Sequence, residues 1–424
     1  MDPKLGDYDA RNFTVIKWLT CMMFMMFAMT TDAVGSVIPV IIREFHLTMT
    51  AAGTFHYVPM AAIGLGAILL GFLADRLGRQ RTIIVGLVLY GVSSVLFAVG
   101  STFSYFVALL AMAGIGISVF KTGGLALIGD VTTSTTEHSS LMNMVEGFFA
   151  TGAIIGPAIV ATLLSTGFSW KWLYVIAAGM CGLLIIVTLS VRFPKTIRAT
   201  EKPAALSHTI RMMKDPYALA FSAMIMLYVA TEVAVYVWMP TYLLGYHGTI
   251  SWLPAYALVI FFVLRAVGRF AGAWLIGRFD WTWIMALFGT AIFLCFLGSL
   301  LGGPLLAAFL LPTSGLFMSM IYPTLNSKGI SCFHKSEHGA AAGVILFFTA
   351  IAAALGPLAM GVVSDSFGGA KYGFVLATGF SFLLVAGLLA NLIVNPAQRR
   401  LQALERVEYS AAHHWSNTQQ RIIE

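Results

Sequence analysis

The sequence predicts an all-α membrane protein with twelve transmembrane helices, arranged as two pseudo-symmetric six-helix bundles. Three observations support this fold class. Hydrophobic residues make up 59% of the 424 residues and charged residues only 10%, and the mean hydropathy is +0.87. Twelve apolar runs are each long enough to cross a bilayer core, which takes about 20 residues. A weak internal repeat relates the first six runs to the last six.

The composition also excludes several function classes. Soluble domains are about one quarter charged, so this chain is neither a soluble enzyme nor a disordered protein, and we expect the lipid bilayer as its surroundings. The net charge of +7 comes from basic residues in short loops, which does not indicate a nucleic-acid partner. The four cysteines show no metal-ligand spacing, and no phosphate-binding Gly-x-x-x-x-Gly-Lys-Ser/Thr loop is present. We therefore expect no enzyme activity, metal site or cofactor.

The apolar runs divide into six plus six at the longest polar gap, 192–216. This predicts a cytoplasmic N-terminus, a first bundle, a cytoplasmic linker, a second bundle and a cytoplasmic tail, at residues 1–17, 18–191, 192–216, 217–394 and 395–424. The runs lie at about 18–42, 52–73, 82–101, 104–130, 140–166, 170–191, 217–245, 251–277, 281–301, 303–330, 338–364 and 371–394.

The distribution of basic residues predicts the orientation. With the N-terminus inside, the inside segments hold 18 of the 25 Lys and Arg residues, and the outside loops hold only Arg43, Lys171 and Lys371. Cytoplasmic loops are enriched in Lys and Arg, so both termini are expected in the cytoplasm. The short loops favour a multi-pass protein of a bacterial inner membrane.

The repeat has an offset of 200 residues. Gly156-Pro157 in the fifth run corresponds to Gly356-Pro357 in the eleventh, and the pairs Phe148/Phe348 and Ala153/Ala353 keep the same offset. Halves related by an axis along the membrane normal, with a site between them, are typical of rocking transporters.

The loop after the second run carries the most specific motif. Residues 71–81 read Gly-Phe-Leu-Ala-Asp-Arg-Leu-Gly-Arg-Gln-Arg. This resembles the signature loop between the second and third helices of the major facilitator superfamily, except that Gln80 stands where a basic residue is common. Such a charged cluster latches one closed state and releases in the other. The resemblance implies a gating role for Gly71, Asp75, Arg76, Gly78 and Arg79.

Three further segments resemble one branch of that superfamily, the fucose permease and sodium-glucose transporter-like proteins. They are Leu227-Tyr-Val-Ala-Thr-Glu-Val-Ala-Val, the stretch from Glu146 to Pro157, and Ile321-Tyr-Pro-Thr-Leu. The resemblance implies a hexose-type substrate and symport with a cation, a proton or sodium. That branch has a carboxylate one turn before the proline that ends its first helix. Here Gly35 stands at that position, and the acid, Asp32, lies about one turn earlier.

Ionisable residues inside the apolar runs are the candidate site residues. A charge at the centre of a helix costs about 2.5–3.5 kcal/mol on insertion scales, so each needs a partner, water or a function. Helices one, four, seven and ten line the cavity in the superfamily, so the resemblance places Asp32, Lys121 and Glu232 facing it.

Glu232 has two tyrosines on its own helical face. Tyr228, Glu232 and Tyr236 follow i, i+4, i+8 spacing. Such a carboxylate can accept hydrogen bonds from sugar hydroxyls, or it can pair permanently with Arg265 of the next helix. We expect Glu232 and Asp32 to carry the coupling proton, because no basic residue of its own helix lies within reach of Asp32.

The remaining candidates leave alternatives open. Lys121 and Glu146 can neutralise each other, or Lys121 can bind an anionic substrate while Glu146 lies beside the gate. Arg269 is expected to pack against loop carboxylates such as Asp280. Tyr322 and Asn326 are candidate hydroxyl-binding residues, and His56 is expected to be solvated or part of a gate.

The predicted function is secondary active transport of a small polar solute, a hexose or related sugar, by proton-coupled symport with alternating access, in a monomer. One alternative is an organic-anion transporter that uses Lys121 and Arg265. A second is a drug:proton antiporter, because Gly152-x-x-x-Gly156-Pro157 resembles the fifth-helix motif of those proteins. A third is a receptor or scaffold on the same fold that transports nothing.

Overall fold

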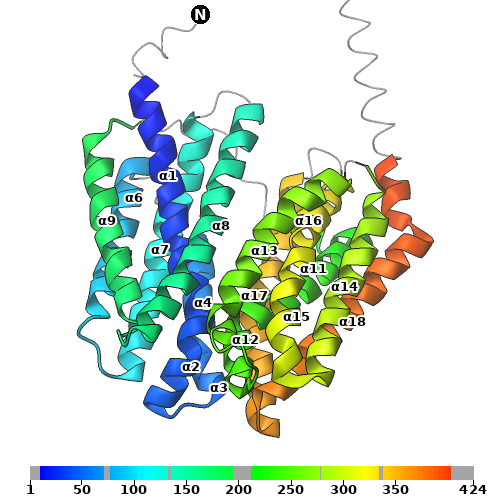
Figure 1. The fold of residues 1–424 in the computed structure, drawn as a ribbon. Helices are drawn as coiled ribbons and strands as arrows, with labels where there is room; N and C mark the ends of the chain where they lie inside the picture. Colours follow the sequence, from blue (N-terminus) through cyan, green and yellow to red (C-terminus); the bar gives the residue numbers. More distant parts are fainter. Residues whose placement is uncertain are drawn as a thin grey trace, which may run out of the picture.

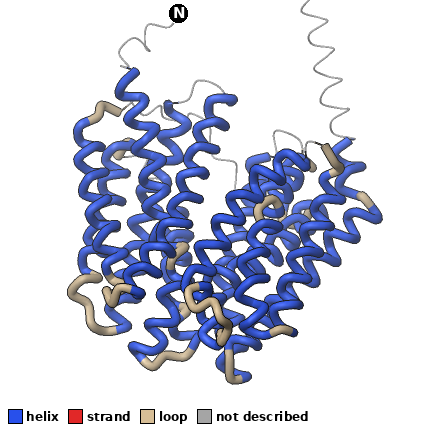
Figure 2. The backbone as a smooth tube through the Cα atoms, viewed as in Figure 1, coloured by secondary structure: helices blue, strands red, loops and turns tan. Residues whose placement is uncertain are grey.

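The computed structural model describes residues 10–70, 77–131, 135–193, 212–276, 278–333 and 338–402. These residues form helices joined by short loops (Figure 2). The first half contains α1 (Ala10–Thr31), α2 (Val34–Phe45), α3 (Met49–Ala52), α4 (Thr54–Leu70), α6 (Arg79–Leu96), α7 (Phe103–Val131), α8 (Thr135–Ser165) and α9 (Trp172–Ser190).

The second half repeats this arrangement as a separate bundle beside the first (Figure 1). It contains α11 (Pro216–Val233), η1 (Ala234–Trp238), α12 (Met239–Tyr242), η2 (Leu243–Gly245), α13 (Leu253–Ile276), α14 (Trp281–Leu301), α15 (Gly303–Met318), α16 (Ile321–Ser331), α17 (His338–Phe367) and α18 (Ala370–Val394).

The two bundles confirm the predicted fold class. Span one is α1 with α2, span seven is α11 with η1 and α12, and span ten is α15 with α16; each other span is one helix. Within the described residues, nine of the twelve spans are long and apolar enough to cross a membrane by themselves. The other three correspond to α4, α6 and α13. The first helix begins at Ala10, inside the segment predicted to precede the bundle, and most of the linker lies outside the described residues.

The internal repeat is visible in the packing. In the first bundle α8 packs on α1, and a side chain at Gly156 would collide with the backbone carbonyl of Met29. In the second bundle α17 packs on α11, and a side chain at Gly356 would lie 3.1 Å from Ala230. The Gly-Pro pairs therefore serve the same contact in both halves, where a small residue lets two helix backbones approach closely.

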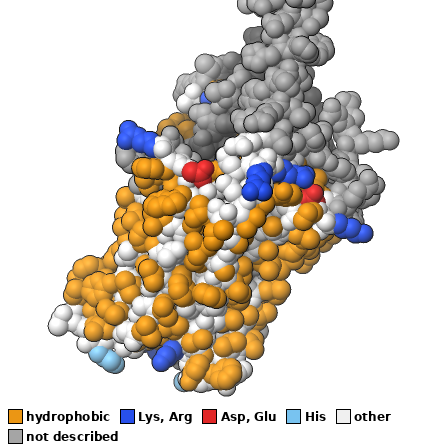
Figure 3. All heavy atoms as spheres, turned by 90° about the vertical axis from the view of Figure 1, so that its right-hand side faces the viewer, with side chains coloured by type: hydrophobic (Ala, Val, Ile, Leu, Met, Phe, Trp, Pro, Cys, Tyr) orange, Lys and Arg blue, Asp and Glu red, His pale blue; other side chains and the backbone are white. Residues whose placement is uncertain are grey.

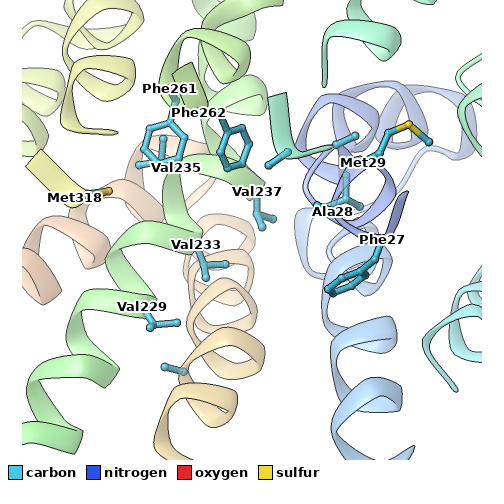
Figure 4. Packing of buried hydrophobic residues seen from close by; sticks show 14 of the residues in the cluster. Phe27, Ala28, Met29, Val229, Val233, Val235, Val237, Phe261, Phe262 and Met318 are labelled. Carbon is cyan, nitrogen blue, oxygen red and sulfur yellow. The ribbon is translucent and has the colours of Figure 1, made fainter. Parts of the chain in front are cut away.

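The outer surface suits a lipid environment. Large apolar side chains such as Leu183, Ile186 and Leu189 are more than half exposed. Figure 3 shows an apolar face across the second bundle, with most of its visible Lys and Arg side chains near one end. Inside, apolar residues of both bundles form one buried cluster, part of which is shown in Figure 4.

The two bundles approach each other toward one end of the molecule. The start of α1 and the end of α18 lie at the opposite end, here called the terminus side, and the ribbons diverge toward it (Figure 1). At the end where the bundles meet, here called the closed side, the carboxylate of Asp365 in α17 accepts hydrogen bonds from the backbone of Met49 and Thr50. The rings of His56 in α4 and Tyr236 in η1 are also in contact there, with centroids 5.6 Å apart.

Candidate functional site

Three of the spans are broken near their middle. Span one is interrupted at Asp32 and Ala33, between α1 and α2, and span ten at Ser319 and Met320, between α15 and α16. Span seven widens into the π-helix η1. Discontinuous helices and π-helical turns are frequent at the binding sites of transporters. Asp32 lies in the first of these breaks, and Glu232 closely precedes η1.

Two prolines account for two of these breaks. Pro240 and Pro323 have no backbone N–H to bond the carbonyls of Tyr236 and Ser319, four residues earlier. The Tyr236 carbonyl lies against Gly35 of α2, where any side chain would collide with it. The breaks were not predicted from the sequence, although these prolines were the available signal in spans seven and ten.

Asp32 lies at the break in span one and is half-buried. Its backbone N–H donates to the carbonyl of Ala28 at 3.0 Å. Within the described residues its carboxylate has no hydrogen-bond or ion-pair partner. Its electrostatic neighbours are Arg265 and Glu232 of the second bundle and Lys121 of its own. An uncommitted carboxylate therefore lies between the bundles.

Glu232 is committed to partners within its own bundle. Its Oε1 lies 2.5 Å from the Arg265 guanidinium, and the Tyr228 hydroxyl lies 2.8 Å from both that oxygen and the carbonyl of Met318. The Glu232 side chain is only 9% exposed and that of Arg265 21%. In this conformation the pairing with Arg265, one of the two predicted alternatives, is present. The role of Glu232 in sugar binding stays a prediction.

The two tyrosines beside Glu232 lie in different surroundings. Tyr228 is fully buried inside the second bundle, with its ring centroid 6.4 Å from that of Tyr322. Tyr236 packs between the rings of His56 and Phe262 at the contact with the first bundle. The structure thus gathers Tyr228, Glu232, Arg265 and Tyr322, while the ring of Tyr236 lies at the contact between the bundles. Half-buried Asn326 follows Tyr322 by one turn.

Lys121 is the second uncommitted charge. Its ammonium lies over the rings of Phe27 and Phe24, 5.0 and 5.8 Å from their centroids, and has no ion pair in the part of the chain that the structure describes. Glu146 and Asp32 are its electrostatic neighbours. Glu146 itself is exposed, so the predicted neutralisation is a long-range interaction and not a contact.

Arg269 also lacks a counterion among the residues that the structure describes. The predicted packing against Asp280 is absent from the described contacts, because Asp280 caps the start of α14 by accepting from the backbone and hydroxyl of Thr282. The electrostatic neighbours of Arg269 include Glu146 of the opposite bundle. Two cations, Lys121 and Arg269, are therefore available on opposite sides of the site.

Part of the signature loop lies outside the described residues, namely Gly71, Asp75 and Arg76. Gly78 has φ +84°, which an L-residue rarely adopts, and Arg79 begins α6 and is buried. Gln80, the departure from the family pattern, donates its side-chain amide to the carbonyl of Thr188 at 2.8 Å. Gln80 thus caps the end of α9, which explains why glutamine stands at this position.

The first bundle contains a small cavity that the sequence did not indicate. Its volume is about 20 Å³, the size of one water molecule. The hydroxyls of Thr30 and Tyr90 lie 2.6 Å apart on its wall. His56 also lines it, is 1% exposed, and has two ring nitrogens without a hydrogen-bond partner among the described residues. His56 is therefore not solvated in this conformation.

A family model described as Major Facilitator Superfamily matches residues 20–357. The chain belongs to the major facilitator superfamily. It is accordingly a multi-pass membrane transporter of small molecules and not an enzyme.

Named relatives match parts of the chain. Multidrug resistance protein 1 of Bacillus subtilis is 33% identical over 162 residues, covering 37% of this chain and 41% of the relative. Multidrug transporter QDR2 of Candida glabrata is 27% identical over 191 residues, covering 44% and 32%. The vesicular acetylcholine transporter of Tetronarce californica is 26% identical over 148 residues, covering 35% and 28%. Each match spans less than half of the relative's length.

Solved structures match nearly the whole chain at low identity, which shows the shared fold. The nucleoside transporter NupG has a TM-score of 0.72 at 14% identity, covering 89% of this chain and 98% of that one. A bacterial homolog of the human lysosomal transporter Spinster scores 0.72 at 13% identity, covering 93% and 99%. The fucose:proton symporter FucP of E. coli scores 0.58 at 20% identity, covering 89% and 98%.

Proposed function

We propose that this transporter moves a small polar solute together with a proton, by alternating access, with a hexose or related sugar as the first substrate class to test. The terminus side would face the cytoplasm of a bacterial cell, and one chain would be the transporting unit. The observation that carries the proposal is Asp32, a carboxylate in a helix break between the bundles, without a partner among the described residues.

A carboxylate in this position is suited to carry a proton. Ionised, Asp32 adds a costly charge to the bilayer interior, and protonation removes that cost. Its electrostatic neighbours lie in both bundles, Lys121 in the first and Arg265 in the second. A change in the charge of Asp32 therefore alters the attraction between bundles that must move apart and together. Glu232 is the second candidate for carrying the proton. It ranks behind Asp32 because it must break its ion pair with Arg265 before it can be protonated.

The sugar assignment rests on groups that bind hydroxyls. Lys121 and Tyr236 are electrostatic neighbours of the uncommitted carboxylate of Asp32. Tyr322 and Asn326 of span ten are further candidates for binding hydroxyls. Among proteins of similar fold, two are described by name as sugar:proton symporters, the fucose symporter already mentioned and a D-xylose-proton symporter.

An organic anion is the second candidate substrate class. Lys121 and Arg269 have no counterion in the described residues and belong to opposite bundles, so a carboxylate or phosphate group between them would be attracted by both. Arg265 contributes less, because Glu232 occupies it. This differs from the predicted anion site, which used Lys121 and Arg265.

Drug:proton antiport is the third candidate, supported by the names of two partial relatives. The fifth-helix motif adds little to it, because Gly152 and Gly156 pack against the carbonyls of Met25 and Met29 in α1. Close helix packing is sufficient reason for these glycines.

The test is solute uptake into proteoliposomes with and without an inward proton gradient, using hexoses, amino sugars, small carboxylates and lipophilic cations. Gradient-driven accumulation of a neutral sugar is the expected result. Accumulation of carboxylates alone would replace the sugar with an anion, and proton-driven movement of lipophilic cations in the opposite direction would establish antiport.

The proton role is tested with Asp32→Asn. This variant should retain exchange of substrate across the membrane but lose proton-driven accumulation. Glu44→Gln is the matched control, because Glu44 accepts a hydrogen bond from Trp170 within the first bundle, far from the site. Unchanged accumulation in a folded Asp32→Asn protein would remove Asp32 from coupling.

A further inference from the structure

The closed side holds a polar contact between the bundles. The Asp365 carboxylate, in the last turn of α17, accepts hydrogen bonds from the backbone N–H of Met49 and of Thr50, each at 2.8 Å. Met49 and Thr50 begin α3, which follows span one of the other bundle. One carboxylate thus holds two backbone donors through both of its oxygens. Hydrogen bonds to an ionised acceptor are about twice as strong as neutral ones.

The packing around this contact depends on glycine. Gly361 lies one turn before Asp365, and a side chain on it would approach Thr50 Cα to 3.2 Å and the Trp238 ring to 3.4 Å. Trp238 is fixed in turn by donating its indole N–H to the carbonyl of Pro357 at 3.1 Å. Gly53, just after α3, packs against the same ring. The two faces fit closely, with the carboxylate contact at their edge.

The contact is placed where water can replace it. Asp365 is exposed, so opening the bundles would transfer its oxygens and the two amides to water instead of to apolar surroundings. Water then supplies most of the lost hydrogen-bond energy, and the contact stabilises the closed arrangement without making it permanent. A contact of this kind can bias an equilibrium between two conformations.

We propose that Asp365 and the α3 amides of Met49 and Thr50 form a latch that keeps the closed side shut and must release each time the site opens to that side. Asp365 is then a positioning residue for the transport cycle and does not touch the solute. The proposal rests on the alternating access proposed above.

Two kinds of variant remove the latch from opposite sides. Asp365→Asn keeps the shape of the acceptor but loses its charge and one acceptor oxygen. Thr50→Pro removes the backbone N–H and the hydroxyl of Thr50 in the first turn of α3, where proline is tolerated. Asp365→Glu keeps the carboxylate and should retain part of the contact, so its closed side should open less readily than that of Asp365→Asn. Glu44→Gln is the control, a carboxylate that bonds Trp170 inside one bundle.

The readout is the reaction of a cysteine placed at His56 with a polar thiol reagent, in protein reconstituted in lipid nanodiscs. His56 is buried between the bundles on the closed side, so it reacts only when that side opens. The four native cysteines are buried and are replaced by serine or alanine to remove their background. Each variant is first checked for a single species by gel filtration.

Both Asp365→Asn and Thr50→Pro should raise the labelling rate about tenfold, as expected for loss of hydrogen bonds to a charged acceptor, while Glu44→Gln leaves it unchanged. Equal rates in the parent, Asp365→Asn and Thr50→Pro proteins would overturn the latch. The labelling needs no substrate. If the variants are labelled faster but no solute is transported, the latch is supported and the proposed function is not. If a solute is transported but the variants are labelled at the parent's rate, the proposed function is supported and the latch is overturned.

Discussion

Asp32 and Glu232 occupy equivalent places in the two halves, since they are separated by the 200 residues that also relate Gly156 to Gly356. Their environments are nevertheless different. Glu232 lies in the last turn of α11, bonded to Arg265 and Tyr228. Asp32 lies in a helix break, and no described residue bonds its carboxylate. The residue 200 positions before Arg265 is Leu65, which is 60% exposed, so the first half has no cation at that place.

The two halves share the position of the acid but differ in whether its carboxylate is paired. A buried pair is costly to break, because removing either member leaves a buried charge without its counterion. An unpaired carboxylate contributes little to folding and is free to exchange a proton. Under the proposed function, the two halves divide a structural role and a coupling role between these two sites.

The largest effect is expected for Arg265→Ala. It leaves Glu232 buried without its counterion, which should lower the free energy of unfolding by about 3–5 kcal/mol. Denaturant titration of the detergent-solubilised protein measures this. The double variant Glu232→Gln with Arg265→Ala should recover much of the loss. A single variant as stable as the parent would mean that the pair is not structural, and the contrast between the halves would fail.

Gly156→Ala should rank next. Its new methyl group meets the Met29 carbonyl in α1, and overpacking of this kind costs about 1–3 kcal/mol. Gly356→Ala is the matched variant in the other half, where the new methyl group lies 3.1 Å from Ala230 and a small shift suffices. The first should lower the melting temperature clearly more than the second. Equal losses would show that the two helix contacts are equally close.

Tyr228→Phe should have a smaller effect, about 1 kcal/mol, because it removes one hydroxyl shared by Glu232 and the Met318 carbonyl. The same titration measures it. The loss of stability caused by Tyr228→Phe should differ when Arg265→Ala is already present, since Tyr228, Glu232 and Arg265 belong to one network. Strict additivity of the two substitutions would contradict a shared network.

Asp32→Asn should have the smallest effect on stability, within about 0.5 kcal/mol of the parent, because no described group bonds its carboxylate. Glu232→Gln, by contrast, should destabilise the protein measurably, since it weakens the pair with Arg265. If both variants were equally stable, the proposed division of roles between Asp32 and Glu232 would lose its basis.

Much of the fold could be predicted from the sequence. Long apolar runs must form helices in a bilayer, since no water is present there to satisfy the backbone, and the signature loop with Gly78 and Arg79 indicated the superfamily. The Gly-Pro pairs at 156 and 356 predicted the repeat, which the packing of α8 on α1 and α17 on α11 confirms.

The site was less predictable. Span one breaks beside Asp32 without a proline there, and the pairing of Glu232 with Arg265 or with a substrate was left open because helix periodicity does not fix the neighbouring helix. The Asp365 contact joins residues more than 300 positions apart. Gly361, Asp365 and Gly368 repeat the spacing of the signature loop faintly, but that local pattern does not indicate the distant partner.

The sequence by itself therefore determined the membrane spans, their duplication and the list of charged residues within them, because hydropathy and helical spacing are local properties. Only the tertiary structure decided which charges have partners and which side of the molecule is closed. Those outcomes depend on contacts between distant helices. Within the low-dielectric interior, a few ångströms separate a structural ion pair from an uncommitted carboxylate such as Asp32.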